Sequence, residues 1–313
     1  MQVRRARVDM SLLATACLVA TYWARTVRWQ QLLQPIGATR FRTAFRATVI
    51  GFAALGVLPA RAGDVLRPYL LARQEGLSVS ATLATVVIER VVDLLVVLIL
   101  MAVYVYGFAD DAMLPARLRG PLEVSAALAG CVAVVLLIVL WLMASHLERI
   151  GTLVGLTNRI LPHGLAGRLA GLASKFSAGL AVVREPRILA RAIAWSFVVW
   201  ILGSGEAWAV SRAFGIEMPF TGAFLLQAFL VLGIAVPTPG GVGSFHEAYR
   251  WCTVTFFHAP NDEAVAAALV LHALSFGPVI LLGALFMAQD GWSLGRLREM
   301  TRSPVEEGTA PTQ

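Results

Sequence analysis

Apolar residues occur in long runs, separated by polar stretches, along most of the chain. A bilayer-spanning helix needs roughly 20 such residues. Runs close to this length or longer lie at 9–27, 79–106, 122–144, 188–211 and 264–288. Two shorter runs, at 43–58 and 220–236, each end in a stretch that contains proline and glycine. The pattern predicts an all-α integral membrane protein, a polytopic helical bundle with two Pro/Gly-broken segments.

The two broken segments have the composition of helices that stop inside a membrane. In "GVLPARAGDVLRPYLLARQEG" (56–76), Pro59 lacks an amide hydrogen and clashes with the preceding helical turn. The second segment, "VPTPGGVGSFHEAYR", is broken by Pro237, Pro239, Gly240, Gly241 and Gly243. We predict that each segment is re-entrant and returns to the side of the membrane from which it entered.

The two broken segments also sit inside an internal repeat. Trp29, Gly37, Phe41, Phe45 and Pro59 have nearly the spacing of a second set that comprises Trp208, Gly215, Phe220, Phe224 and Pro237. Matched interrupted segments in two halves are typical of transporter-type sites. The alternative is that two apolar sequences resemble each other by composition alone.

The repeat divides the chain into parts. We predict a single transmembrane domain, 1–302, with repeat halves at 9–106 and 188–288. The span at 122–144 and a basic linker at 145–187 join the halves, and a disordered polar tail follows at 303–313.

Composition excludes a soluble domain. Hydrophobic residues make up 58% of the chain and charged residues only 14%, against roughly 25% in soluble proteins. The mean hydropathy is +0.73. The net charge of +7 is the difference between 26 basic and 19 acidic residues. No basic soluble domain remains that could bind nucleic acid.

The basic residues predict an orientation in the membrane. With re-entrant segments, 25–75 (eight Arg, two acids) and 145–191 (seven basic, two acids) share one side. The other side receives 107–123 and 212–263, where acids outnumber arginines. The positive-inside rule then predicts inverted repeats in an inner membrane, with the linker 145–187 and the C-terminus cytoplasmic. Arg4, Arg5 and Arg7 fall on the wrong side, which an additional upstream span or an error in this topology would explain.

The first candidate site follows the first break. Arg61, Asp64 and Arg67 are three residues apart and would share a face if helical. Two guanidiniums oriented by Asp64 would hold an anionic group between them. An ordinary basic cytoplasmic loop is the alternative.

The second candidate site lies within an apolar run, "VVIERVVDLLVV", which contains Glu89, Arg90 and Asp93. Intramembrane charges are costly, so they usually pair inside the protein and mark function. Arg90 can pair with Asp93 at i,i+3. Glu89 and Asp93 share a face at i,i+4, and one of the two can be protonated or can reach Arg61 or Arg67. A structural charge cluster near the interface is the alternative.

The third candidate site is the second break. Amides freed between Pro237 and Gly243 would bind a phosphate or carboxylate. Glu247 can pair with Arg250, which also stands where a zinc protease motif needs its second histidine. The three cysteines have no metal-binding spacing. We therefore predict no metal, no cofactor and no catalytic residue.

Two single polar residues lie in the later apolar runs. Glu206 is a candidate for a central polar site, and we interpret His272 as a core histidine with a satisfied hydrogen bond rather than a ligand.

Four motifs in order carry a resemblance over about residues 10–295: "RW..LL", "LPARAGDVLRPYLL", "ERVVDLL" and "PTPGGVGSFHEA". Together they resemble the flippase-like, lysylphosphatidylglycerol synthase transmembrane-region family, which includes uncharacterised UPF0104-type inner-membrane proteins. The resemblance implies that substrate meets the polar positions Arg61, Asp64, Arg67, Glu89, Arg90, Asp93, the break at 237–243 and Glu247. The aminoacyl-transferase domain of the synthases is absent, so we do not expect an enzyme.

The resemblance and the charges lead to one functional expectation. It is a flippase-like integral membrane protein that transports or binds an anionic phospholipid or a polyprenyl-linked lipid. Its expected partners are membrane lipids with an anionic headgroup, and either a second copy or a lipid-modifying enzyme. One alternative is a membrane-embedded enzyme with Glu89, Asp93 or Glu247 as general base. Another is a non-catalytic scaffold for a lipid-modifying synthase.

Overall fold

A computed structural model describes residues 8–58, 61–108, 180–236 and 238–291, together with scattered positions between 120 and 179. Regular structure in these ranges is helical, as predicted. The first half contains α1 (Val8–Leu33), α2 (Phe41–Val57), α3 (Gly63–Glu75) and α4 (Val79–Gly107). The second half contains η2 (Leu180–Arg184), α8 (Pro186–Ala213), α9 (Gly222–Ala235), η3 (Pro239–Gly241), α10 (Ser244–Phe257) and α11 (Asn261–Gln289).

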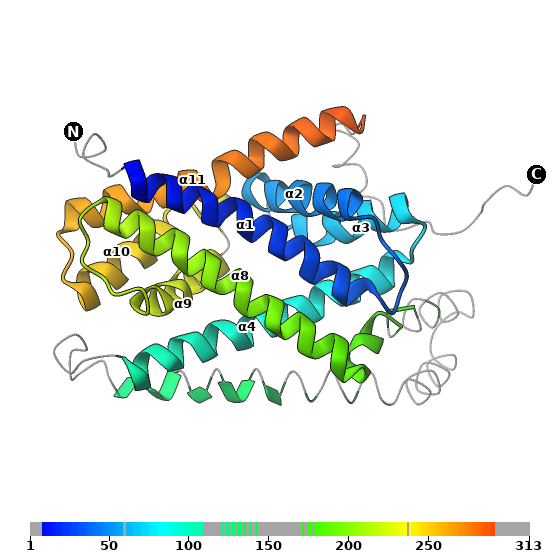
Figure 1. Ribbon diagram of the computed structural model, residues 1–313, viewed down its shortest axis with the longest axis horizontal. Helices are drawn as coiled ribbons and strands as arrows, with labels where there is room; N and C mark the ends of the chain where they lie inside the picture. Colours follow the sequence, from blue (N-terminus) through cyan, green and yellow to red (C-terminus); the bar gives the residue numbers. More distant parts are fainter. Residues whose placement is uncertain are drawn as a thin grey trace, which may run out of the picture.

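The long helices form the body of the bundle. Within the described part, α1, α8 and α11 are each long and apolar enough to cross a membrane. Helices α1 and α8 pack side by side along the middle of the molecule (Figure 1). Helix α4 is also long, and 16 of its 29 residues are buried. The chain is therefore a helical membrane protein with polar residues enclosed between long helices.

The two broken segments form helical pairs, α2–α3 and α9–α10. These four helices have 17, 13, 14 and 14 residues. At about 1.5 Å per residue they measure roughly 20–26 Å, which is shorter than a hydrocarbon core of about 30 Å. The pairs lie toward opposite ends of the long axis (Figure 1). The breaks are confirmed, and the re-entrant course stays a prediction.

The tips of the two helical pairs contact each other. A Cβ on Gly240 would lie 2.8 Å from the carbonyl oxygen of Gly56, so only glycine permits this approach. Gly240, Gly241 and Gly243 have φ angles of 61°, 71° and 88°, a region that side chains rarely adopt. The Nε2 atom of His272 in α11 lies 2.8 Å from the Gly240 carbonyl oxygen. This contact agrees with the interpretation of His272 as a core histidine with a satisfied hydrogen bond.

The helices follow the same order of lengths in both halves: long, short, short, long. This order is what the repeat at 9–106 and 188–288 predicts, although the domain division and the inversion stay predictions. The span 122–144 and the linker 145–187 lie largely outside the described residues. Arg4, Arg5, Arg7, Pro59, Pro237 and the tail 303–313 lie outside them as well.

Helix α1 is longer than its apolar run. The run ends at residue 27, but the helix continues to Leu33 because no helix breaker occurs before Pro35. Arg25 and Arg28 therefore lie inside the helix, and Arg28 is only 1% exposed. The orientation argument had placed both arginines in a cytoplasmic stretch. The structure shows both within α1, facing the interior of the bundle, and the side of the membrane on which the stretch lies stays a prediction.

Candidate functional site

Six ionisable side chains meet between α1, α3 and α4. We call this group the charged cluster; it comprises Arg28, Asp64, Arg67, Glu89, Arg90 and Asp93. Glu89 is fully buried and receives two guanidiniums, Arg67 at 2.8 Å and Arg28 at 3.0 Å. One of the two carboxylates of α4 thus reaches Arg67, as predicted, and Arg28 is a partner that the sequence did not indicate.

Asp93 is the second anchor of the charged cluster. It pairs with Arg28 in close contact, and Arg90 lies 3.9 Å away, which confirms the predicted i,i+3 pair. Trp200 of α8 donates its indole N–H to Asp93 Oδ1 at 2.9 Å. Arg28 also donates to the hydroxyl of Ser196 on α8, at 2.9 Å. The cluster thus joins α8 to α1 and α4.

The first break contributes two residues to the charged cluster. Arg67 is 2% exposed and its guanidinium lies 3.8 Å from the centre of the Trp29 ring, a cation–π contact. Asp64 accepts from Arg90 at 2.5 Å. Arg61 precedes α3 with a φ of 54°, so it is not on the helical face predicted for it, and it pairs with Asp64 at 3.5 Å on the surface.

The charged cluster balances its own charge. Three guanidiniums face three carboxylates, and no formal charge is left over. Removing ions from water is costly, and close pairing with hydrogen bonds offsets that cost. This arrangement fixes the relative positions of α1, α3, α4 and α8, and it leaves little charge for a ligand.

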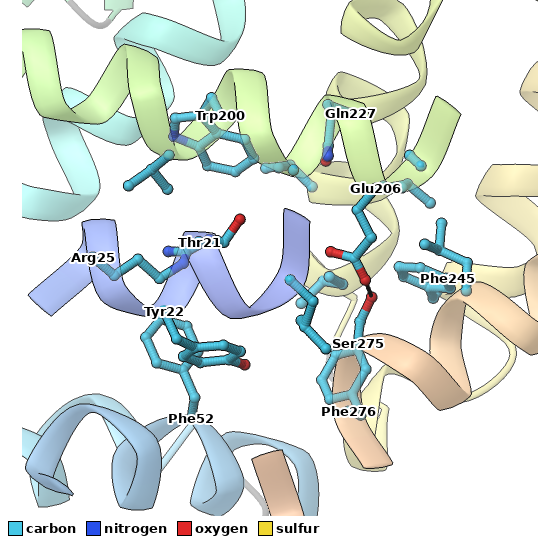
Figure 2. A pocket seen from close by; sticks show the side chains of 18 residues that line it. Thr21, Tyr22, Arg25, Phe52, Trp200, Glu206, Gln227, Phe245, Ser275 and Phe276 are labelled. Carbon is cyan, nitrogen blue, oxygen red and sulfur yellow. Dashed lines mark hydrogen bonds between the residues drawn. The ribbon is translucent and has the colours of Figure 1, made fainter. Parts of the chain in front are cut away.

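A cavity of about 170 Å³ lies beside the charged cluster. We call it the central cavity. Its wall is built by α1, α2, α8, α9, α10 and α11, and it is mostly apolar. Seven side chains with a polar group, labelled in Figure 2, give it its chemical character: Thr21, Tyr22, Arg25, Trp200, Glu206, Gln227 and Ser275. At about 30 Å³ of liquid volume per water molecule, it has room for several waters or a small polar group.

Two ionisable side chains lie on opposite sides of the central cavity (Figure 2). The guanidinium of Arg25 lies 4.8 Å from the Phe52 ring centre and 5.9 Å from that of Trp200. No carboxylate of the described residues lies within ion-pair distance of it. Glu206 is 7% exposed and accepts a hydrogen bond of 2.7 Å from the Ser275 hydroxyl. The cavity therefore holds a cation and an acid that do not touch each other.

Trp200 belongs to both regions. Its ring lines the central cavity near Arg25, while its N–H is bonded to Asp93 of the charged cluster. A movement of the indole would therefore change both the wall of the central cavity and the hydrogen bond to Asp93.

The sequence missed the arginines of α1, although a signal was present. Thr21, Arg25 and Arg28 are spaced by four and three residues, which places them on one face of a helix. Glu206, a candidate from the sequence, does lie in a central polar site. Gln227 and Ser275 gave no distinctive signal.

The second break is arranged differently from its prediction. The amide of Gly241 already donates to the Thr238 carbonyl at 3.1 Å, and that of Gly243 donates to His246 Nδ1 at 3.2 Å. These two amides are occupied within the chain and do not point to an anion site. Glu247 pairs with Arg250 as predicted, on an exposed surface. Among the described residues, no group of three or more His, Cys, Asp or Glu could hold a metal ion.

Comparison with known proteins identifies the family of this chain. The lysylphosphatidylglycerol synthase transmembrane region family matches residues 2–283, nearly the whole chain. The chain belongs to that family. The four sequence motifs thus indicated the correct family.

Two relatives match the chain over different shares of their own length. The chain is 26% identical to the glycosyltransferase AglD of Haloferax volcanii over 88% of its own length. The match covers 48% of AglD, so the chain spans about half of that protein. It is also 23% identical to the UPF0104 membrane protein MJ1078 of Methanocaldococcus jannaschii, over 73% of this chain and 90% of that one.

Proposed function

We propose that this protein binds a membrane lipid with an anionic headgroup in the central cavity and moves it across the bilayer. The observation that carries the proposal is Arg25. It is a guanidinium in the wall of an intramembrane cavity, with aromatic faces beside it and no carboxylate at ion-pair distance among the described residues. Guanidinium groups bind phosphate with two parallel hydrogen bonds.

The rest of the cavity also supports the binding of a lipid headgroup. Its apolar side chains suit the part of a lipid next to the headgroup, and Thr21, Tyr22 and Gln227 can bond its polar atoms. Family membership is consistent with a role in lipid handling. The sequence-derived proposal that the charged cluster itself binds lipid has weaker support, because its guanidiniums already face carboxylates.

Proteoliposomes containing the full chain test this function. Fluorescent phosphatidylglycerol is placed in both leaflets, and an external quencher reports how fast inner-leaflet lipid reaches the surface. We expect wild-type protein to make the whole label accessible. Arg25→Ala loses a charge-assisted contact of about 1.5–3 kcal/mol, so it should slow the movement roughly 10–100-fold.

The same vesicles separate transport from chemistry. The name of AglD describes a glycosyltransferase, so an enzymatic role is the alternative to test. Lipid mass spectrometry after the assay decides between them. Movement with unchanged lipid mass supports transport, and a new lipid mass supports an enzyme. No movement and no mass change would contradict both and favour a scaffold.

A further inference from the structure

Glu206 has no role in the function proposed above. It lies in the wall of the same cavity as Arg25, on the neighbouring helix α8, and it is almost completely buried. Its hydrogen-bond donor within the described part of the chain is one neutral hydroxyl, Ser275. A carboxylate can accept about four hydrogen bonds. A buried acid with so few partners at membrane depth calls for an explanation, because such residues often belong to ion or proton pathways.

The surroundings of Glu206 offer one charged neighbour across the cavity. Arg25 and Tyr22 of α1 are the other titratable groups in the cavity wall, and Cys17 of α1 lies next to Gly205. Helices α2, α9, α10 and α11 contribute neutral side chains to the described wall. The nearby His272 of α11 instead contacts the Gly240 carbonyl and the Phe245 and Phe276 rings. Arg25 is therefore the charged side chain of the described cavity wall that can act on Glu206.

We propose that Glu206 takes up a proton when an anionic headgroup binds Arg25, so that the lipid and the proton cross the membrane together. With the cavity empty, the positive field of Arg25 favours the ionised carboxylate. A bound phosphate cancels that field, and the proton moves from water onto a Glu206 oxygen. No bond other than O–H forms or breaks. Release of the headgroup restores the field, and the proton returns to water on the other side.

Charge balance gives the coupling its physical benefit. A headgroup with one negative charge and one proton cross together as a neutral pair. Moving net charge through a bilayer is expensive, and coupling to the proton removes that charge from the transported unit. This inference rests on the proposed lipid transport and adds its driving force.

A pH gradient across proteoliposomes tests the coupling. The probe is fluorescent phosphatidylglycerol in phosphatidylcholine vesicles that contain the full chain. At full coupling, one pH unit should concentrate the probe about tenfold in the leaflet on the alkaline side. Glu206→Gln cannot take up the proton, so it should leave the probe evenly distributed at every gradient. Glu217→Gln, which changes an exposed carboxylate between α8 and α9, should behave like the wild type.

Each outcome of this assay is decisive. Wild-type protein that moves the probe without responding to the gradient overturns the coupling and leaves lipid transport standing. A Glu206→Gln protein that keeps the tenfold asymmetry also overturns it. Wild-type protein that moves no probe refutes the proposed transport, and the coupling with it.

A binding measurement covers the case in which Glu206→Gln does not reconstitute. Short-chain phosphatidylglycerol is added to the purified protein in weakly buffered detergent with a pH indicator. Wild-type protein should take up a proton for each bound lipid, and Glu206→Gln should bind lipid without proton uptake. Inorganic phosphate in place of the lipid shows whether free phosphate is sufficient. Lipid binding without proton uptake by the wild type would contradict the proposal.

Discussion

The charged cluster and the central cavity hold ionisable side chains in opposite ways. In the cluster, three guanidiniums and three carboxylates touch one another, and Glu89 is completely buried between Arg67 and Arg28. In the cavity, Arg25 and Glu206 face a shared space without touching. The two regions are less than one helical turn apart along α1, since Arg25 and Arg28 are three residues apart.

This difference separates stability from function. Paired buried charges resist the loss of either partner, because the remaining ion is left without compensation. Unpaired groups in a cavity are available to a ligand, and removing one has little effect on the fold.

The largest effect should come from Glu89→Gln. This change leaves two buried guanidiniums, those of Arg28 and Arg67, without their shared carboxylate. Breaking a buried pair costs about 3–5 kcal/mol, so thermal unfolding in detergent should occur at a clearly lower temperature. Glu247→Gln is the matched control, since Glu247 is exposed and should contribute about 0–1 kcal/mol. Equal effects of the two changes would show that the cluster does not stabilise the bundle.

A matched pair of substitutions separates the two arginines of α1. Arg28→Lys loses the planar geometry that bridges Glu89, Asp93 and Ser196, and stability should fall by about 1–3 kcal/mol. Arg25→Lys keeps a charge in the cavity and should leave the unfolding temperature unchanged. Thermal unfolding of both variants is compared with their lipid movement. A loss of stability for Arg25→Lys as large as that for Arg28→Lys would contradict the contrast.

Trp200→Phe tests the side chain that the two regions share. Phenylalanine keeps an aromatic ring in the cavity wall but removes the N–H that bonds to Asp93. We expect a loss of about 1–2 kcal/mol in stability from the missing hydrogen bond. Lipid movement should change little at a temperature where the variant is fully folded. A large loss of movement would place Trp200 in direct contact with the lipid.

The smallest effect should come from Arg61→Asn. Arg61 lies on the surface, 54% exposed, and its pair with Asp64 is long. Asparagine tolerates the positive φ of this position, so backbone strain is not added. Stability should change by no more than about 1 kcal/mol. Asp64→Asn should lower the stability more than Arg61→Asn, because Asp64 also pairs with Arg90. A larger loss of stability for Arg61→Asn than for Asp64→Asn would contradict this account.

Local sequence predicted much of the fold. Long apolar runs correspond to α1, α4, α8 and α11, and the prolines and glycines correctly marked both breaks. Glu89, Arg90 and Asp93 stood out because charges within an apolar run need internal partners. The pairs Arg90–Asp93 and Glu247–Arg250 could be inferred from their i,i+3 spacing, whereas Arg67 was only one of two arginines expected to reach a carboxylate of α4.

The arginines of α1 were hidden by hydropathy. A charged residue at the end of an apolar run looks like the end of a span, but Arg28 is buried because α4 supplies carboxylates to it. The central cavity could not be predicted, because its wall is built by helices from both halves of the chain. Only their packing shows that Arg25 and Glu206 share one space.

Native mass spectrometry of the purified protein tests the central claim most directly. Wild-type protein and Arg25→Ala are extracted under the same conditions, and the phospholipid bound to each is identified by mass. The account predicts that the wild type retains an anionic lipid and that Arg25→Ala, folded to the same unfolding temperature, loses it. Equal retention of that lipid by both proteins would contradict the claim that Arg25 holds the headgroup.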